Sequence, residues 1–196
     1  RTGLKIPRSQ GHESSILSPG IMGSTVIIAI VGPTASGKSA LAVEVARAVG
    51  GEIISCDSRQ VYKGLNIGTG KISKREMRGV AHHLLDVANP KNQFSVAEWR
   101  QKAEKVVQEI TARGKVPIIC GGTGFYLDAL IGKISVPDVP PNPTLRARLA
   151  LKSTTQLFAI LINLDHRRAQ TIDRDNPRRL IRAIEIAKVL GKVPIV

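Results

Sequence analysis

Aromatic residues, acidic residues and long apolar runs are all scarce in this chain. Phe, Tyr and Trp make up 3% of its 196 residues, too few to form a platform on which single-stranded bases would stack. No apolar run approaches the roughly 18 residues that a membrane-spanning helix requires, so we expect no membrane segment. Acidic residues number 15 against 29 Lys and Arg, which leaves a net charge of +14. This excess favours a polyanionic partner, with nucleic acid as the first candidate, over a basic surface without a partner.

Only two cysteines, Cys56 and Cys120, occur in the chain, and each ends an apolar run. Neither belongs to a Cys pair or a Cys/His set with the spacing of a metal site. We therefore expect buried, unpaired thiols in a reducing compartment. The adjacent His82 and His83 have no carboxylate at ligand spacing, so hydrogen bonding is favoured over metal binding as their role.

The most informative stretch of the sequence has the pattern of a phosphate-binding loop. It comprises Gly32, Pro33, Thr34, Ala35, Ser36, Gly37, Lys38 and Ser39. An apolar, β-branched run over residues 25–31 precedes it and a helical pattern over residues 38–49 follows it, which is the setting that such a loop requires. The backbone N–H groups and the helix N-terminus would bind an anion, Lys38 would reach its terminal phosphates, and Ser39 would ligate Mg²⁺. A plain glycine-rich turn is the alternative.

Strands and helices alternate along the next part of the chain. We predict strands over 52–56, 82–87 and 116–120, a long loop over 63–80, and helices over 95–113 and 125–130. This alternation predicts a doubly wound parallel sheet. Asp57 and the turn Gly121–Gly124 each follow a strand, so both are expected at the sheet edge where such folds bind ligands.

The character of the sequence changes after a proline-rich linker at residues 137–143. Beyond it we predict helices over 144–151, 157–164 and 177–190. Arg178 and Arg182 share a face of the last helix, in the most arginine-rich part of the chain. A phosphate-rich partner, a solvated face and ion pairs with nearby aspartates are the possible explanations. The expected organisation is an extension without regular structure over 1–21, an α/β core over 22–136, a helical region over 137–190, and a return towards the core over 191–196.

Several of these segments, taken in order, resemble one family. They are G-P-T-A-S-G-K-S, D-S-R-Q-V-Y-K-G-L-N-I-G-T-G-K, H-H-L-L-D, G-G-T-G-F-Y and N-P-R-R-L-I-R-A-I-E-I. The chain looks like a tRNA dimethylallyltransferase, and D-S-R-Q-V-Y is the most specific of the matching segments. The resemblance implies a P-loop NTPase-like parallel sheet flanked by helices, with a small helical region that binds tRNA.

The resemblance also implies a reaction. Members of the family transfer a dimethylallyl group from dimethylallyl diphosphate to the exocyclic amine of the adenine 3′-adjacent to the anticodon in tRNA. The phosphate loop with Lys38 and Mg²⁺ would then bind the diphosphate, Asp57 would act as general base, and Thr123 would contact the adenine or its ribose. The expected tRNA contacts are Asp57, Ser58, Arg59, Gln60, Thr123, Arg178, Arg179 and Arg182.

The sequence departs from the family pattern in three ways. Cys56 replaces a small residue, and His166 replaces a proline that usually follows an aspartate. Family members also continue past the point corresponding to Val196, with a stretch that completes the sheet and supplies a diphosphate-binding arginine, so we expect a C-terminally truncated member. Three alternatives stay open: an adenylate isopentenyltransferase acting on free nucleotide, a P-loop small-molecule kinase, and a tRNA-binding fragment without turnover. We expect a monomer in the cytoplasm, with organelle targeting by residues 1–21 left open.

Overall fold

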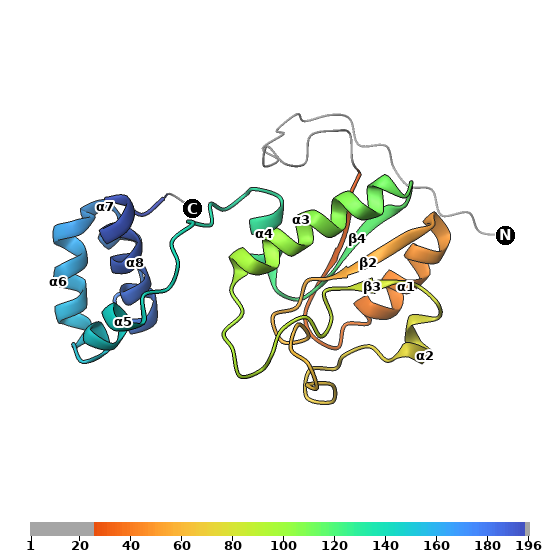
Figure 1. Ribbon diagram of the computed structural model, residues 1–196, viewed down its shortest axis with the longest axis horizontal. Helices are drawn as coiled ribbons and strands as arrows, with labels where there is room; N and C mark the ends of the chain where they lie inside the picture. The colour runs from red at the N-terminus through yellow and green to blue at the C-terminus, as the bar shows by residue number, and fades with distance from the viewer. Residues whose placement is uncertain (1–25, 195–196) are drawn as a thin grey trace.

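The computed structural model describes residues 26–194 and contains an α/β part followed by a helical part (Figure 1). The predictions for residues 1–21 and 195–196 lie outside the described residues. The sheet consists of β1 (Ile28–Val31), β2 (Gly51–Ser55), β3 (His82–His83) and β4 (Val116–Gly121). Its strand order is β1-β4-β2-β3 and all neighbours are parallel. The predicted parallel α/β fold is confirmed.

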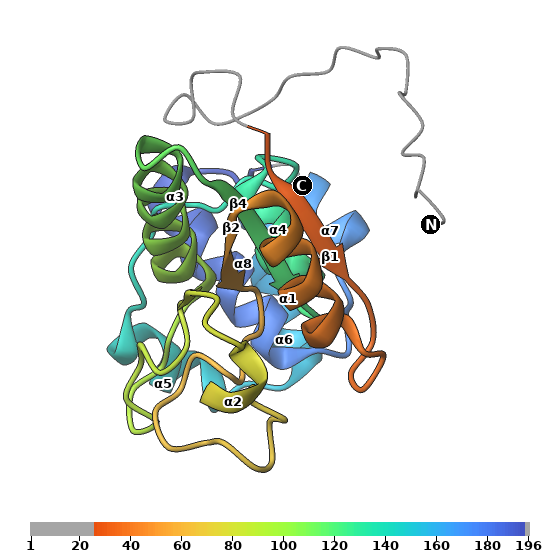
Figure 2. The same cartoon turned by 90° about the vertical axis from the view of Figure 1, so that its right-hand side faces the viewer.

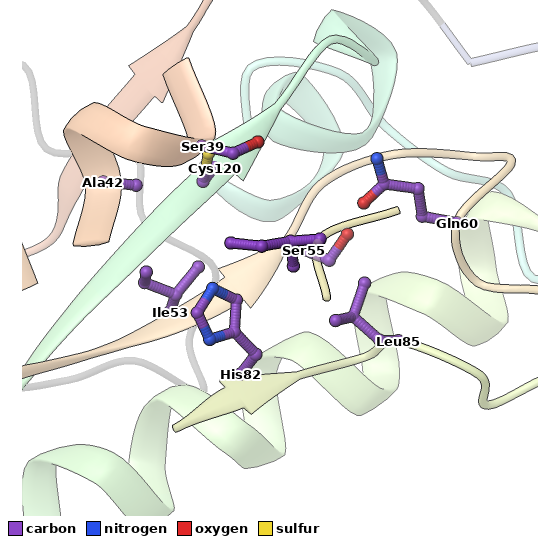
Figure 3. Close-up of a pocket in the computed structure, with 9 residues that line it drawn as sticks. Ser39, Ala42, Ile53, Ser55, Gln60, His82, Leu85 and Cys120 are labelled. Carbon is purple, nitrogen blue, oxygen red and sulfur yellow. The ribbon is translucent and has the colours of Figure 1, made fainter. Parts of the chain in front are cut away.

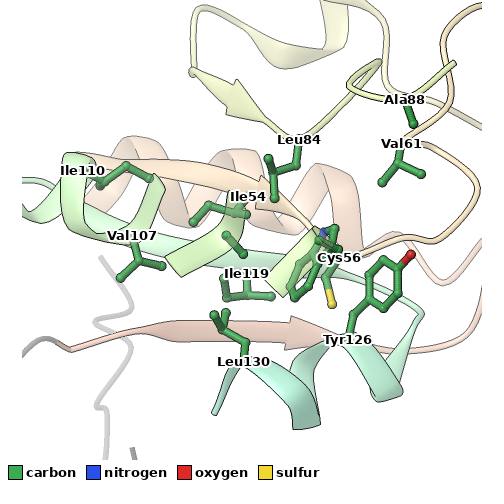
Figure 4. Close-up of a cluster of buried hydrophobic side chains, with 12 residues drawn as sticks. Ile54, Cys56, Val61, Leu84, Ala88, Val107, Ile110, Ile119, Tyr126 and Leu130 are labelled. Carbon is green, nitrogen blue, oxygen red and sulfur yellow. The ribbon is translucent and has the colours of Figure 1, made fainter. Parts of the chain in front are cut away.

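Helices cover both faces of this sheet (Figure 2). α1 (Lys38–Val49) packs on one face. α3 (Val96–Ala112) and α4 (Gly124–Leu130) pack on the other, where Ile54, Ile119 and Leu130 lie in one buried cluster (Figure 4). Both thiols are free and buried, as expected. None of the described helices is long and apolar enough to cross a membrane.

Two predictions about the segment between β2 and α3 were wrong. The expected loop over 63–80 contains a short helix, α2 (Lys74–Met77), which begins at a capping box between Ser73 and Glu76. The third strand stops at His83 instead of residue 87, because Leu84 and Asp86 have φ angles of 61° and 55°. A left-handed backbone cannot continue a strand, so the chain turns there.

The helical part has its own core. It consists of α5 (Pro143–Ala150), α6 (Thr154–Leu164), α7 (His166–Thr171) and α8 (Pro177–Leu190), and the sequence did not predict α7. Leu157 and Leu161 of α6 pack against Leu180 and Ile184 of α8, and all four are fully buried. The i, i+4 spacing of each pair places its two side chains on one helix face.

A buried carboxylate joins the linker to the last helix. Glu185 is 1% exposed and accepts hydrogen bonds from the Asn142 backbone N–H at 2.6 Å and from Arg146 Nε at 3.0 Å. Arg182 also donates to Glu185, and its Nη2 donates to the Val139 carbonyl at 2.9 Å. Burial raises the pKa of Glu185, but these donors outweigh it and hold that pKa at about 2.

A second buried carboxylate lies at the start of β2. Glu52 accepts hydrogen bonds from Arg113 at 2.7 Å and Lys115 at 2.8 Å, and it lies 2.7 Å from His83 Nε2. Burial raises the pKa of Glu52, and its three partners together lower it to about 2. His83 therefore has the hydrogen-bonding role that the sequence favoured.

Candidate phosphate and nucleic-acid site

Three loops meet at the carboxyl edge of the sheet. The phosphate loop follows β1, the Asp57 loop follows β2, and the glycine turn follows β4. The last two approach so closely that a Cβ on Gly121 would lie 2.1 Å from the Cys56 carbonyl oxygen. A Cβ on Gly122 would lie 3.4 Å from the Gly32 carbonyl. Glycine at position 121 is thus a steric requirement for bringing the loops together.

The phosphate loop curls around its own lysine. Ala35 and Gly37 have φ angles of 63° and 78°, a left-handed conformation that turns successive backbone N–H groups inwards. Lys38 begins α1, and its Nζ donates a 2.7 Å hydrogen bond to the Pro33 carbonyl across the loop. The ammonium group is therefore held over the concave side, where a phosphate would lie.

Asp57 uses one carboxylate oxygen to shape its loop. Oδ1 accepts hydrogen bonds from the backbone N–H of Arg59 at 2.8 Å and of Gln60 at 3.3 Å. Oδ2 has no hydrogen-bond partner among residues 26–194, and the side chain is half-buried at the loop junction. The carboxylate is thus oriented by the backbone and keeps one oxygen available to accept a proton.

Thr123 and Ser58 connect the β4 turn to the Asp57 loop. Thr123 Oγ1 accepts a 3.0 Å hydrogen bond from the Ser58 backbone N–H and donates to Ser58 Oγ at 3.3 Å. The Thr123 backbone N–H donates to the Cys56 carbonyl at 3.1 Å. The structure therefore brings together Asp57, Ser58 and Thr123, as the sequence predicted for a common edge.

Gln60 holds the loop that follows it. Its side-chain amide donates to the carbonyls of Thr69 at 3.2 Å and Gly70 at 3.4 Å. Lys71 supports the same loop by donating to the Tyr62 carbonyl at 2.7 Å and to Asp86 at 2.6 Å. Gln60 thus has a structural role that the sequence did not suggest, and its contact with tRNA stays a prediction.

A small cavity lies behind the phosphate loop, between α1, β2 and β3 (Figure 3). Ser55 of β2 lines it and is buried, with no hydrogen-bond partner for Oγ within the described residues. Its other lining residues are Ser39, Ala42, Ile53, Gln60, Ile72, His82, Leu85 and Cys120. Ser55 could not be singled out from the sequence, where it is one polar residue in the apolar run that ends at Cys56.

Burial shifts the pKa of two residues that line this cavity, His82 and Cys120, and of the buried Cys56 thiol. It raises the pKa of Cys120 and lowers that of His82, and it raises the pKa of Cys56 to about 12. The thiols therefore stay protonated near neutral pH and are poor nucleophiles. His82 is neutral there, because burial penalises the imidazolium form.

The residues present suit a magnesium ion that is held mainly by its substrate. No group of three or more His, Cys, Asp or Glu side chains in residues 26–194 could hold a metal ion. Ser39, in the first turn of α1, occupies the motif position whose hydroxyl would ligate Mg²⁺. Mg²⁺ commonly binds through one or two protein ligands, phosphate oxygens and waters, so this set fits the ion.

The four arginines predicted to contact tRNA differ in their surroundings. Arg59 and Arg178 are exposed, and Arg178 has no hydrogen bond or ion pair within the described part of the chain. Arg179 is also exposed, and its Nη1 lies 3.6 Å from Asp173. Arg182 is engaged by Glu185 and by the Val139 carbonyl. Arg182 therefore stabilises the helical part itself, whereas Arg59, Arg178 and Arg179 present charge to solvent.

Comparison with known proteins identifies the family. The family model for IPP transferase matches residues 60–195. This chain belongs to the IPP transferase family. A tRNA dimethylallyltransferase from Thermomicrobium roseum is 43% identical over an alignment of 174 residues, and the match covers 85% of this chain and 52% of the relative. A tRNA dimethylallyltransferase 2 from Trichlorobacter lovleyi is 49% identical over an alignment of 164 residues, and the match covers 82% of this chain and 52% of the relative.

Solved structures give the same result for the fold. The full-length tRNA isopentenylpyrophosphate transferase from Bacillus halodurans is 41% identical, with a TM-score of 0.56, over 85% of this chain and 56% of its own. A eukaryotic dimethylallyltransferase acting on tRNA is 28% identical, with a TM-score of 0.73, over 84% of this chain and 41% of its own. The chain thus spans about half the length of the relatives that it matches.

Proposed function

We propose that this IPP transferase chain transfers a dimethylallyl group from dimethylallyl diphosphate to tRNA. The acceptor is the exocyclic amine of the adenine 3′-adjacent to the anticodon, and diphosphate is released. The observation that carries the proposal is the convergence of the phosphate loop, Asp57 and Thr123 at one sheet edge. The relatives named as tRNA dimethylallyltransferases support the same reaction.

In the proposed reaction, the phosphate loop stabilises the leaving diphosphate and the Asp57 loop accepts the proton of the amine. The allylic carbon–oxygen bond breaks, the diphosphate leaves with the bonding electrons, and a bond forms from the adenine amine to the carbon. Loop N–H groups and Lys38 stabilise the charge that develops on the diphosphate. Mg²⁺ bound through Ser39 would neutralise part of the same charge. The amine loses its proton to Asp57, whose Oδ2 is available for it.

The end of β4 distinguishes this proposal from a kinase. P-loop NTPases hold Mg²⁺ with a loop Ser or Thr and an aspartate from a second strand motif. The strand beside β1 in this sheet is β4, and it ends in Cys120 and Gly121 without a carboxylate. A site of this kind suits the departure of a diphosphate better than phosphoryl transfer from ATP.

The exposed arginines of α8 favour tRNA over a free nucleotide as acceptor. Arg178 and Arg179 project from the helical part, which a mononucleotide would not need to contact. The expected partners are accordingly tRNA and dimethylallyl diphosphate. A monomer in the cytoplasm remains our expectation, and light scattering of the purified chain tests the oligomeric state.

The deciding experiment mixes the chain with labelled dimethylallyl diphosphate, Mg²⁺ and bulk tRNA. Digestion to nucleosides should yield one labelled adenosine derivative that maps next to the anticodon. Parallel reactions offer AMP as the acceptor, or replace the donor with labelled ATP. Labelled AMP would support the adenylate isopentenyltransferase, and phosphoryl transfer from ATP would support the kinase. Binding of tRNA without any labelled product would support a tRNA-binding fragment without turnover.

A further inference from the structure

A buried hydroxyl in the cavity behind the phosphate loop has no partner in the described part of the chain, and the proposed reaction does not use it. Ser55 is 4% exposed, and its Oγ makes no hydrogen bond to any of residues 26–194. Leaving such a group unpaired costs its desolvation free energy, so almost all buried polar atoms have a partner. The geometry therefore indicates a ligand or solvent group that completes this site.

The other polar groups of the cavity offer acceptors. His82 Nδ1 lies 2.9 Å from the Val80 carbonyl, which can only accept, so Nδ1 carries the proton and Nε2 is left as an acceptor. Gln60 commits its amide N–H groups to Thr69 and Gly70, which leaves its Oε1. Among residues 26–194, no carboxylate lines the cavity. A lining of neutral acceptors suits hydrogen-bond donors, such as the water molecules around a cation.

Ser39, the expected protein ligand of Mg²⁺, connects this cavity to the magnesium position. It lines the same cavity as Ser55 and His82, and Figure 3 shows the His82 ring beside Ile53 of the neighbouring strand. Magnesium gives up its water reluctantly and usually keeps several water ligands. Outer groups that accept hydrogen bonds from metal ligands orient those ligands and tune the affinity.

We propose that Ser55 and His82, assisted by Gln60, form the outer hydrogen-bonding shell of a hydrated Mg²⁺ held by Ser39 and the diphosphate. The three groups take the place of a carboxylate at the end of β4, where the chain has Cys120 and Gly121. This proposal rests on the proposed function of the phosphate loop. Ser55 and His82 are positioning residues, because they act through the water ligands of the ion and not on the reacting atoms.

The test measures metal affinity directly. Mn²⁺, a spectroscopic substitute for Mg²⁺, is titrated into the chain with saturating inorganic pyrophosphate, and free Mn²⁺ is followed by electron paramagnetic resonance. Ser55→Ala and His82→Leu should each weaken Mn²⁺ binding by about tenfold. Pyrophosphate binding measured in EDTA should stay unchanged. Ser135→Ala and His166→Ala remove the same groups from exposed positions of the chain and serve as matched controls.

A Ser55 hydroxyl with no role in metal binding would have a different effect on stability and on Mn²⁺ affinity. If its hydroxyl is only an unpaired buried group, Ser55→Ala should raise the melting temperature, because an apolar replacement removes a desolvation cost. Mn²⁺ affinity would then equal that of the wild type, and this overturns the proposal. A wild-type chain that fails to bind pyrophosphate contradicts the proposed function as well. If pyrophosphate binds normally and both variants keep the wild-type Mn²⁺ affinity, the roles proposed for Ser55 and His82 are contradicted, while the proposed function is not.

Discussion

Thr123 Oγ1 accepts a 3.0 Å hydrogen bond from the backbone N–H of Ser58, which lies 65 residues earlier in the chain. This bond connects the turn after β4 to the loop that carries Asp57. It fixes the general base of the proposed reaction relative to the glycine turn.

Removing the Thr123 hydroxyl should loosen the site. Thr123→Val keeps the shape but leaves the Ser58 N–H without its acceptor, and this should destabilise the chain by about 1–2 kcal/mol. Turnover should also fall, because Asp57 is then less well positioned. Thermal melting and single-turnover prenylation of tRNA check both effects. Thr123→Ser restores the hydroxyl, so it should recover most of the loss; a variant as impaired as Thr123→Val would contradict this role.

Lys38→Ala should weaken the binding of dimethylallyl diphosphate by roughly 10–100-fold, the range expected for a hydrogen bond to a charged group. The fold should persist, because within the described residues Lys38 Nζ donates only to the Pro33 carbonyl, in an exposed loop. Calorimetric titration measures the affinity. Lys105→Ala on the surface of α3 removes the same charge and should have no effect. Equal affinity in the wild type and Lys38→Ala would remove the phosphate loop from the diphosphate site.

Asp57→Asn should lower turnover by roughly 10²–10⁴-fold with little change in substrate binding. The asparagine keeps an oxygen that can accept from the N–H groups of Arg59 and Gln60, so the loop should keep its shape. The amide cannot take the proton of the adenine amine. Single-turnover assays at high enzyme concentration, with tRNA affinity measured alongside, separate the two effects. Normal turnover would reduce Asp57 to the structural role of its Oδ1.

Arg178 and Arg182 should respond differently to alanine substitution. Arg178→Ala should weaken tRNA binding and reduce the slope of log K against log[salt] by about 0.7–0.9, with unchanged stability. Arg182→Ala should lower the melting temperature, because Glu185 and the Val139 carbonyl lose a donor. Neither should alter the affinity for dimethylallyl diphosphate. A salt slope that Arg178→Ala leaves unchanged, in a folded variant, would place this arginine outside the tRNA interface.

Glu185 should make stability depend on pH in the acidic range. Its folded pKa of about 2 lies below the ordinary value of 4.5, so the carboxylate is favoured in the folded state. Its contribution, about 3 kcal/mol, is complete above pH 4.5 and is lost as the pH falls towards 2. The stability difference between wild type and Glu185→Gln should shrink over this window. Glu109→Gln removes a carboxylate from an exposed pair with Lys105 and serves as the matched control.

The elements that could be predicted from sequence are those whose determinants are local. The phosphate loop, the α3 capping box at Ser95 and Glu98, and the Asn176–Pro177 start of α8 each occupy a few consecutive residues. Neighbouring residues supply both the pattern and the hydrogen bonds that it needs. The parallel sheet also followed from sequence, since alternating strands and helices allow few other arrangements.

Other features depended on groups that only the fold brings together. Whether Arg182 would face tRNA or a buried partner could not be read from its helix position, because Glu185, Arg146 and the linker at Val139 meet only after folding. Ser55 likewise looked like one polar residue in an apolar strand. Its lack of a partner depends on side chains from α1, β3 and the Gln60 loop. The sequence by itself determined the local phosphate-binding motif and the class of sheet, because short-range periodicity and capping specify them. The tertiary structure alone decided which polar groups are paired, because pairing depends on distances between residues far apart in the chain.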